Sequence, residues 1–264
     1  MSFLWIYDLP NWLLGVLTVL VVTGLSAAGL VASRPYVRRV VGPPPGYNDV
    51  VSYFLGAFGV FYGLTIGLIA VASWQNLADL EGLVNEEASA LRVLDRAVIL
   101  YPEPSRSQLH RLLVVYVDNV IEDEWPAQTR AEAPESGSPL LADFGRALAD
   151  VEPATAGQQA LHAETFQALN HYVELRRERL FSVGTGLPEV VWWVLVLGAA
   201  LNIGLTYLFA VERLGVHLLL TLALAAFVAL LVFLIAAMDH PFLGEFSVGP
   251  DAFVALRQQM PSAT

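Results

Sequence analysis

The sequence predicts an all-α integral membrane protein with four transmembrane helices and a helical, water-facing insert between the second and the third. Hydrophobic residues make up 56% of the chain and charged residues only 15%. Four apolar stretches, each close to the 20 or so residues that cross a hydrocarbon core of about 30 Å, run over Leu13–Ala32, Val50–Trp74, Val190–Val211 and Val216–Met238. Because backbone groups in lipid must be satisfied within their own segment, these stretches are predicted to be helices.

Most of the acidic charge lies between the second and third stretches. Residues 75–187 contain 18 acidic residues and 9 arginines, which gives this segment a formal charge of −9. The chain is therefore expected to divide into the first two spans (1–74), the acidic insert (75–187), the last two spans (188–238) and a C-terminal tail (239–264).

The first apolar stretch is interpreted as a membrane helix. Asp8 precedes it, and its first basic residues, Arg34, Arg38 and Arg39, follow it, whereas a signal peptide needs a basic segment in front. A cleaved signal is the alternative, because the stretch ends in small residues. Residues 33–49 are expected to form a short loop, since the Pro43–Gly46 run cannot continue a helix.

The second span is predicted to continue into water as one helix from near Asp49 to near Leu100. Beyond Trp74 an almost heptad apolar stripe consists of Leu77, Leu80, Val84, Leu91, Leu94 and Val98. The charged residues of this segment lie mostly off the stripe; they are Glu81, Glu86, Glu87, Arg92 and Asp95.

Three more helices are predicted in the insert. The first ends at Trp125-Pro126, since proline lacks a backbone donor, and its apolar face comprises Leu109, Leu112, Leu113, Tyr116, Val117, Val120 and Ile121. A linker (127–139) and a shorter helix near Leu140–Val151 follow. The last helix runs from about Gly157 to Phe181, with a packing face of Leu161, Phe166 or Thr165, Leu169, Tyr172, Val173, Leu175 and Leu180.

The side of the membrane on which the insert lies is left open. Three arginines in the first loop would place that loop in the cytoplasm and the insert outside. Five arginines that flank the second and third spans on the insert side favour the opposite arrangement; they are Arg92, Arg96, Arg176, Arg177 and Arg179.

Small and polar residues within the spans are the candidate functional residues. The second span carries Gly56, Gly59, Gly63 and Gly67, together with Tyr62. Such a glycine stripe favours close helix packing; the alternative is a pore lining or hinge, which requires a homo-oligomer that brings one helix per subunit to an axis. In the third span, Asn202 and Thr206 favour interhelical hydrogen bonds, with an ion pathway as the alternative.

Acidic groups in the insert are weak candidates for a metal site. Glu86–Glu87 and Glu122–Glu124 offer the oxygen ligands that calcium prefers. A third candidate set, on one helix face, comprises Glu164, His171, Glu174 and Glu178. Acidic surface clusters are ordinarily solvated, so the expectation is that no metal is bound.

Other classes of function are not supported by the sequence. The absence of cysteine excludes disulfides, thiolate catalysis and cysteine-ligated metals. The net charge of −11 and the lack of a basic stripe argue against nucleic-acid binding. Since no glycine-rich phosphate loop, GxSxG elbow or HExxH motif is present, neither a catalytic site nor a cofactor is expected.

Four segments resemble a bacterial bestrophin-like membrane protein family with four spans and a helical insert. They are NEEASALRVLDRAV, YVDNVIEDEWP, RRERLFSVGTGLPEVVWW and the tail MDHPFLGEFSVGPDAF. The residues that carry the resemblance are Glu124, Trp125, Pro126, Arg176, Arg179, Pro188, Asp239, Pro241, Phe242 and Gly244. Their order and spacing match across nearly the whole chain.

The resemblance implies a homo-oligomeric anion channel of the bacterial inner membrane, with the second span lining the axis and the insert in the cytoplasm. Membrane lipid is the expected surroundings. The candidate ion ligand is chloride, from the resemblance, or calcium, from the acidic groups of the insert. The chain departs from the family in having no clear run of ring-forming aromatics, because Phe54, Phe58 and Phe61 lie off the glycine face. The alternative function is a non-conducting scaffold or sensor whose insert binds a partner.

The tail is expected to turn at Pro241 and Gly244 and to fold back on the insert. Phe242 and Phe246 would then pack against the insert. Asp239 would pair with an arginine of the Arg176–Arg179 group.

Overall fold

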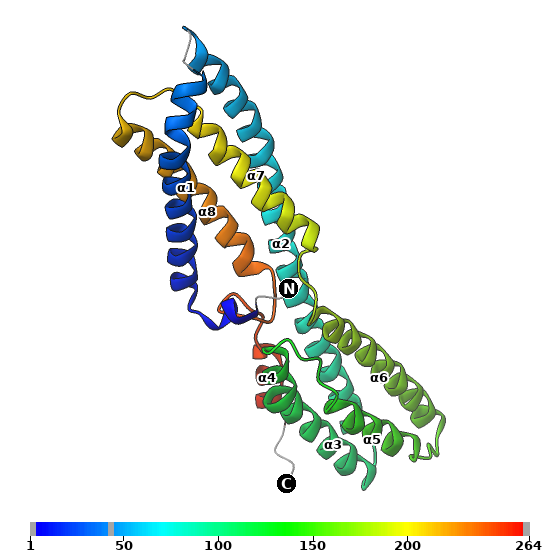
Figure 1. Cartoon of the computed structure of the whole chain (residues 1–264). Helices are drawn as coiled ribbons and strands as arrows, with labels where there is room; N and C mark the ends of the chain where they lie inside the picture. Colours follow the sequence, from blue (N-terminus) through cyan, green and yellow to red (C-terminus); the bar gives the residue numbers. More distant parts are fainter. Residues whose placement is uncertain (1–3, 42–44, 261–264) are drawn as a thin grey trace. The chain divides into compact units, whose positions relative to one another are not determined.

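The computed structural model describes residues 4–41 and 45–260, and every regular element in this part of the chain is helical (Figure 1). In order they are η1 (Leu4–Asp8), α1 (Asn11–Val41), α2 (Tyr47–Ile99), α3 (Ser105–Asn119), η2 (Val120–Glu124), α4 (Trp125–Gln128), α5 (Gly137–Ala149), α6 (Ala156–Ser182), α7 (Glu189–Tyr207), α8 (Leu214–Met238) and α9 (Asp251–Gln259). Four of them, α1, α2, α7 and α8, are long and apolar enough to cross a membrane. The predicted fold class is confirmed.

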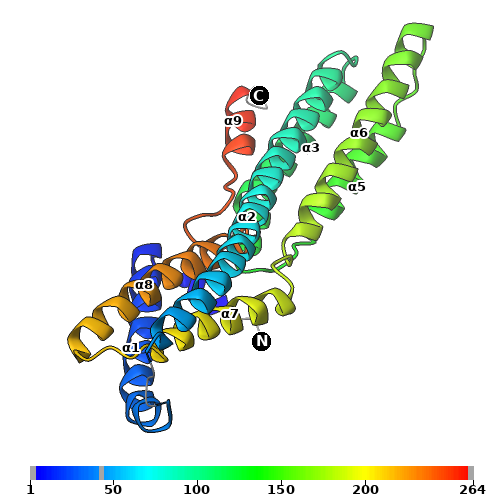
Figure 2. The same cartoon turned by 90° about the horizontal axis from the view of Figure 1, so that it is seen from above.

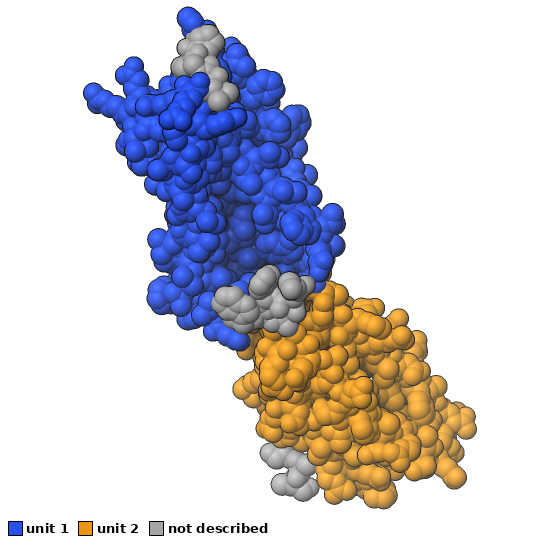
Figure 3. All heavy atoms as spheres, viewed as in Figure 1, with its two compact units in different colours: residues 1–75, 186–239 blue, residues 76–185, 240–264 orange. Residues whose placement is uncertain are grey.

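The chain forms two compact units, coloured separately in Figure 3. The membrane unit comprises residues 1–75 and 186–239, and the insert unit comprises residues 76–185 and 240–264. Helix α2 is continuous over 53 residues and contributes to both units, as the uninterrupted apolar stripe predicted.

In the membrane unit, α1 lies along α8, and α7 lies along the membrane part of α2 (Figures 1 and 2). Ile66, Leu195 and Ile235 form a small buried cluster between α2, α7 and α8. The hydroxyl of Tyr7 donates to the backbone oxygen of Ala236 at 3.0 Å, which ties η1 to the end of α8.

The predicted loop at residues 33–49 was wrong in its first half, because α1 continues through Pro35 to Val41. Proline is tolerated in membrane helices where neighbouring groups satisfy the backbone that it frees. The end of α1 is held by Arg34 and Arg38, which donate to backbone oxygens of the α7–α8 loop. Pro43 and Pro44 of the proline run lie outside the described residues.

The insert unit has one large apolar core. It is built from the second half of α2 with α3, η2, α5, α6 and α9, and it includes Leu91, Leu113, Phe144 and Tyr172. The apolar faces predicted for the helices of the insert are largely those buried here. Val173 is an exception, because its side chain is 42% exposed.

The helix predicted to stop at Trp125-Pro126 does not stop there. A π-helical turn over Val120–Glu124 follows α3, and α4 carries the helix on to Gln128. Pro126 lies at the junction of this π-helical turn with α4, where the change of hydrogen-bond register interrupts the regular helical pattern. The linker is therefore shorter than predicted, and α5 begins at Gly137.

The tail packs into the insert unit, although only one of its two aromatic residues is buried as predicted. Phe242 is 1% exposed and contacts Trp125 edge to face, with ring centroids 6.1 Å apart. Phe246 is exposed. The indole of Trp125 donates to the backbone oxygen of Val248 at 3.2 Å, and Phe253 of α9 packs on the same ring.

Candidate functional site

The membrane part of α2 is the span least covered by its own chain. In the most apolar 18-residue stretch of α2, only 6% of the residues are buried. The corresponding stretches of α1, α7 and α8 are 17%, 22% and 28% buried. Its exposed aromatic residues include Tyr53, Phe54, Phe58 and Phe61. Most of the circumference of α2 is therefore free to meet lipid or another copy of the chain.

Helix α7 packs against one narrow face of α2. The hydroxyl of Tyr62 donates to the backbone oxygen of Leu195 at 3.0 Å. The ring of Tyr62 lies so close to Gly198 that a Cβ atom there would come within 2.5 Å of it. Gly198, which the sequence reasoning missed, is thus needed for close approach of the two helices.

The glycines of α2 do not share one environment. A Cβ atom at Gly59 would lie 3.8 Å from the amide oxygen of Asn202, so this glycine faces α7. At Gly56, Gly63 and Gly67 the same atom would meet nothing within 4 Å. These three glycines are therefore not used to pack helices of one chain against each other.

Thr206 belongs to a buried polar cluster between α7 and α8. Its hydroxyl lies 3.1 Å from that of Thr221, and a ring nitrogen of His217 lies 2.8 Å from its backbone oxygen. Asn202 instead donates to the oxygen of Gly198 within α7. His217 and Thr221 were not singled out in the sequence; a histidine and a threonine four residues apart near the start of a span were the signal.

The buried centre of the insert unit is an ionic network. Arg179 donates from Nε to Glu87 at 2.6 Å and from Nη2 to Glu124 at 2.9 Å, and all three side chains are fully buried. Arg176 donates to the other oxygen of Glu124 at 2.6 Å. Two carboxylates thus balance two guanidinium groups, which is the condition for burying charge at tolerable cost.

Local helix geometry assembles this network. Arg176 and Arg179 are three residues apart on α6 and so share a face. The π-helical turn η2 buries both Val120 and Glu124, and its end is marked by a bond from the Trp125 backbone N–H to the Val120 oxygen. A Cβ atom at Gly137 would collide with the Glu124 carboxylate, so the start of α5 must be glycine.

Aromatic groups complete the network. The guanidinium of Arg179 lies 5.1 Å from the ring centre of Trp125 and 5.7 Å from that of Phe253. Burial alone would lower the pKa of Arg179, but the charges and hydrogen bonds of Glu87 and Glu124 outweigh it and raise that pKa. Arg179 therefore stays charged. The hydroxyl of Tyr172 donates to that of Tyr116 at 2.6 Å, and burial raises the pKa of both phenols.

One prediction about a charged residue, Glu87, is corrected here. The carboxylates that bind Arg176 and Arg179 within the insert unit are Glu87 and Glu124. Within the membrane unit, Asp239 accepts a hydrogen bond from the backbone of Leu187 at 2.6 Å. Glu87, which the apolar stripe placed among the solvated charges, is buried.

The candidate metal sites also do not form. Within residues 4–41 and 45–260, no group of three or more histidine or acidic side chains is arranged to hold a metal ion. Glu87 and Glu124, one from each calcium candidate, are instead committed to arginines.

Comparison with known proteins identifies relatives of this architecture. The family model described as Bestrophin-like domain matches residues 13–253. A solved variant of a bacterial bestrophin homolog from Klebsiella pneumoniae superposes with a TM-score of 0.70 at 12% identity, covering 93% of this chain and 98% of that one. A second Klebsiella pneumoniae structure gives 0.67 at 13%, with coverages of 93% and 99%. No curated protein matches the sequence significantly. At these identities the solved structures establish a shared fold.

Proposed function

The chain belongs to the bestrophin-like family, and from that premise we propose that it is a homo-oligomeric anion channel whose pore is lined by α2. One observation carries the proposal. Among the four spans, α2 is the least covered by its own chain, and it leaves Gly56, Gly63 and Gly67 facing open space. A helix in this state is suited to lie at the axis of a symmetric ring, where copies of itself provide the missing neighbours.

The absence of charged residues from the membrane part of α2 argues against a proton-coupled step. The membrane part of α2 between Val50 and Trp74 contains no charged residue, whereas proton relays use carboxylates or histidines within the spans. We assign the insert unit to the cytoplasm and the protein to the bacterial inner membrane on the same family premise.

The proposal is tested by measuring chloride flux through the purified protein after its reconstitution into liposomes. Purified protein of known oligomeric mass is placed in liposomes and compared with Gly63→Leu and Gly24→Leu. Gly24, on α1, is the matched control, since a Cβ atom there also meets nothing within 4 Å. We expect a ring-sized oligomer with chloride flux in the wild type and Gly24→Leu, and strongly reduced flux in Gly63→Leu at unchanged oligomeric mass.

One result would count against the channel, and another would count against a pore-lining role of Gly63. A folded wild-type oligomer that passes neither chloride nor cations would favour the scaffold or sensor function, with the acidic insert unit as its working surface. Loss of the oligomer in Gly63→Leu would assign this glycine to packing between subunits.

A further inference from the structure

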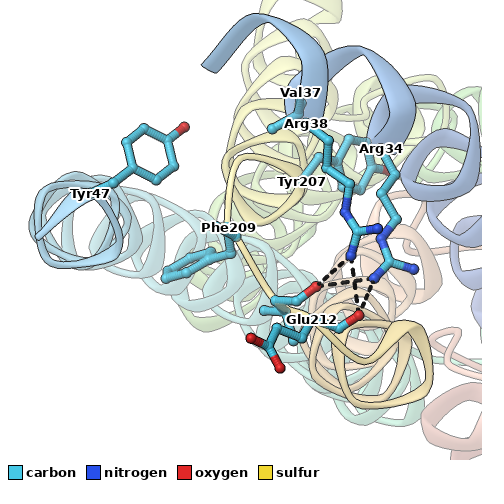
Figure 4. Close-up of a pocket in the computed structure, with 9 residues that line it drawn as sticks. Arg34, Val37, Arg38, Tyr47, Tyr207, Phe209 and Glu212 are labelled. Atoms are coloured by element: carbon cyan, nitrogen blue, oxygen red, sulfur yellow. Dashed lines mark hydrogen bonds between the residues drawn. The ribbon is translucent and has the colours of Figure 1, made fainter. Parts of the chain in front are cut away.

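A pocket of about 270 Å³ lies in the membrane unit between the end of α1, the start of α2 and the loop that joins α7 to α8 (Figure 4). Two arginines of α1, Arg34 and Arg38, contribute its positive charge. Its aromatic lining comes from Tyr47, Tyr207 and Phe209. None of these residues belongs to the candidate pore face of α2.

The walls of the pocket are fixed by hydrogen bonds from two sides. The amide of Asn48 donates to the backbone oxygen of Ala210 at 3.2 Å and accepts from its backbone nitrogen at 2.9 Å. From the other side, Nη2 of Arg34 donates to the backbone oxygens of Val211 at 3.0 Å and Glu212 at 2.8 Å. The pocket is therefore a built feature of the fold.

The charge of the two arginines is not neutralised within the described residues. Arg38 donates to the same backbone oxygen of Glu212 at 3.1 Å, so both guanidinium groups converge on neutral carbonyls. Figure 4 shows the Glu212 carboxylate pointing away from them. No ion pair involves either arginine in the described part of the chain, and Nε of Arg34 is buried with no hydrogen-bond partner there.

The position of the pocket near the membrane surface indicates a lipid head group as its ligand. It lies where three predicted spans end, which is the border between hydrocarbon and water. Tyrosine favours this border, and basic pockets between membrane helices bind acidic lipid head groups. The planar guanidinium group matches phosphate oxygens geometrically. The donors of Arg34 and Arg38 not used on the loop are available for such oxygens.

We propose that this pocket binds the phosphate of an anionic phospholipid. Arg34 and Arg38 contact the phosphate oxygens, while Tyr47, Tyr207 and Phe209 lie against the glycerol and the adjoining methylenes. The bound lipid thereby bridges α1, α2 and the α7–α8 loop. This binding does not depend on whether the protein conducts ions.

Lipid titration followed by native mass spectrometry tests the proposal on the full-length protein in a neutral detergent. The wild type is compared with Arg38→Gln and with Arg39→Gln. Arg39 is the matched control, because it is an exposed neighbour with the same charge that does not line the pocket. Phosphatidylglycerol is the probe, phosphatidylcholine the neutral comparison and inorganic phosphate the free anion.

We expect the wild type and Arg39→Gln to bind phosphatidylglycerol in preference to phosphatidylcholine. Arg38→Gln should lose about tenfold in that affinity, the effect of one charge-assisted contact. Equal affinity of Arg38→Gln and Arg39→Gln would overturn the site. An Arg38-dependent response to inorganic phosphate without one to phosphatidylglycerol would overturn the lipid as ligand.

Discussion

Nε of Arg179 donates to Glu87 at 2.6 Å in the centre of the insert unit, and this one pair joins α6 to the second half of α2. Both side chains are fully buried. The same guanidinium reaches Glu124 of η2 and lies on the ring of Trp125. The side chain of Arg179 thus connects α6 to α2 and to η2. It also contacts the Trp125 ring, against which the tail packs.

Removing this guanidinium should strongly destabilise the insert unit. Arg179→Gln leaves Glu87 buried without its counter-charge, and breaking a buried pair in this way costs about 3–5 kcal/mol. The exposed neighbour Arg177 is the control, and Arg177→Gln should have a much smaller effect. Thermal unfolding in detergent, followed by tryptophan fluorescence, measures the difference. Equal unfolding midpoints for the two variants would show that the network contributes little.

A second prediction concerns the contact between α2 and α7. Gly198→Ala places a Cβ atom 2.5 Å from the ring of Tyr62. The helices must separate, so we expect a lower unfolding temperature, consistent with the 1–3 kcal/mol or so typical of overpacking. Gly204→Ala on the same helix, where the added atom meets nothing within 4 Å, is the control. Matching stabilities would mean that Tyr62 moves aside without cost.

The tail should be part of the folded insert unit. Phe253 is fully buried and contacts both Trp125 and Arg179. Truncating a buried phenylalanine to alanine costs about 3–5 kcal/mol. Phe253→Ala should therefore release the tail to proteolysis at protease concentrations that leave the wild type intact. Phe246→Ala, at an exposed position of the same tail, should retain the wild-type digestion pattern.

Acid should weaken the stabilisation that the Glu103 carboxylate gives to the start of α3. Oε2 of Glu103 accepts hydrogen bonds from the Ser107 hydroxyl at 2.7 Å and the Ser107 backbone at 3.2 Å. The Ser107 hydroxyl first, and Arg106 next, lower the pKa of Glu103 below the ordinary value of 4.5. A lowered folded-state pKa means that the stabilisation is present above that ordinary value and is lost as the pH falls through the folded-state pKa.

Comparison with Glu103→Gln isolates this effect. The unfolding temperature of the wild type, measured relative to the variant, should decrease on acidification below 4.5. A difference that stays constant through this range would show that the carboxylate contributes equally in both protonation states.

The sequence predicted the elements well and the polar interior less well. Hydrophobic length located all four spans, and the stripe from Leu77 to Val98 predicted that α2 continues beyond the membrane. Glu87 was misplaced because helical periodicity cannot reveal that Arg179, 92 residues later, would neutralise it. The π-helical turn at Val120–Glu124 was missed for a similar reason, since its stability depends on tertiary contacts of Glu124 and Trp125.

For the glycines of α2, too, the sequence predicted the spacing but not the tertiary contacts. The spacing of Gly59, Gly63 and Gly67 suggested one shared environment, but α7 covers only the side that contains Gly59. Which side is covered depends on the ring of Tyr62 and its contact with Gly198, and no local pattern in either span encodes that pairing.

Thiol labelling during flux tests the assignment of α2 to the pore most directly. The natural chain has no cysteine, so Gly63→Cys provides a unique thiol for a charged, membrane-impermeant methanethiosulfonate reagent, with Gly24→Cys as the control. We predict that labelling Gly63→Cys in liposomes changes chloride flux while labelling of Gly24→Cys does not. Complete labelling of Gly63→Cys with unaltered flux would contradict an α2-lined pore.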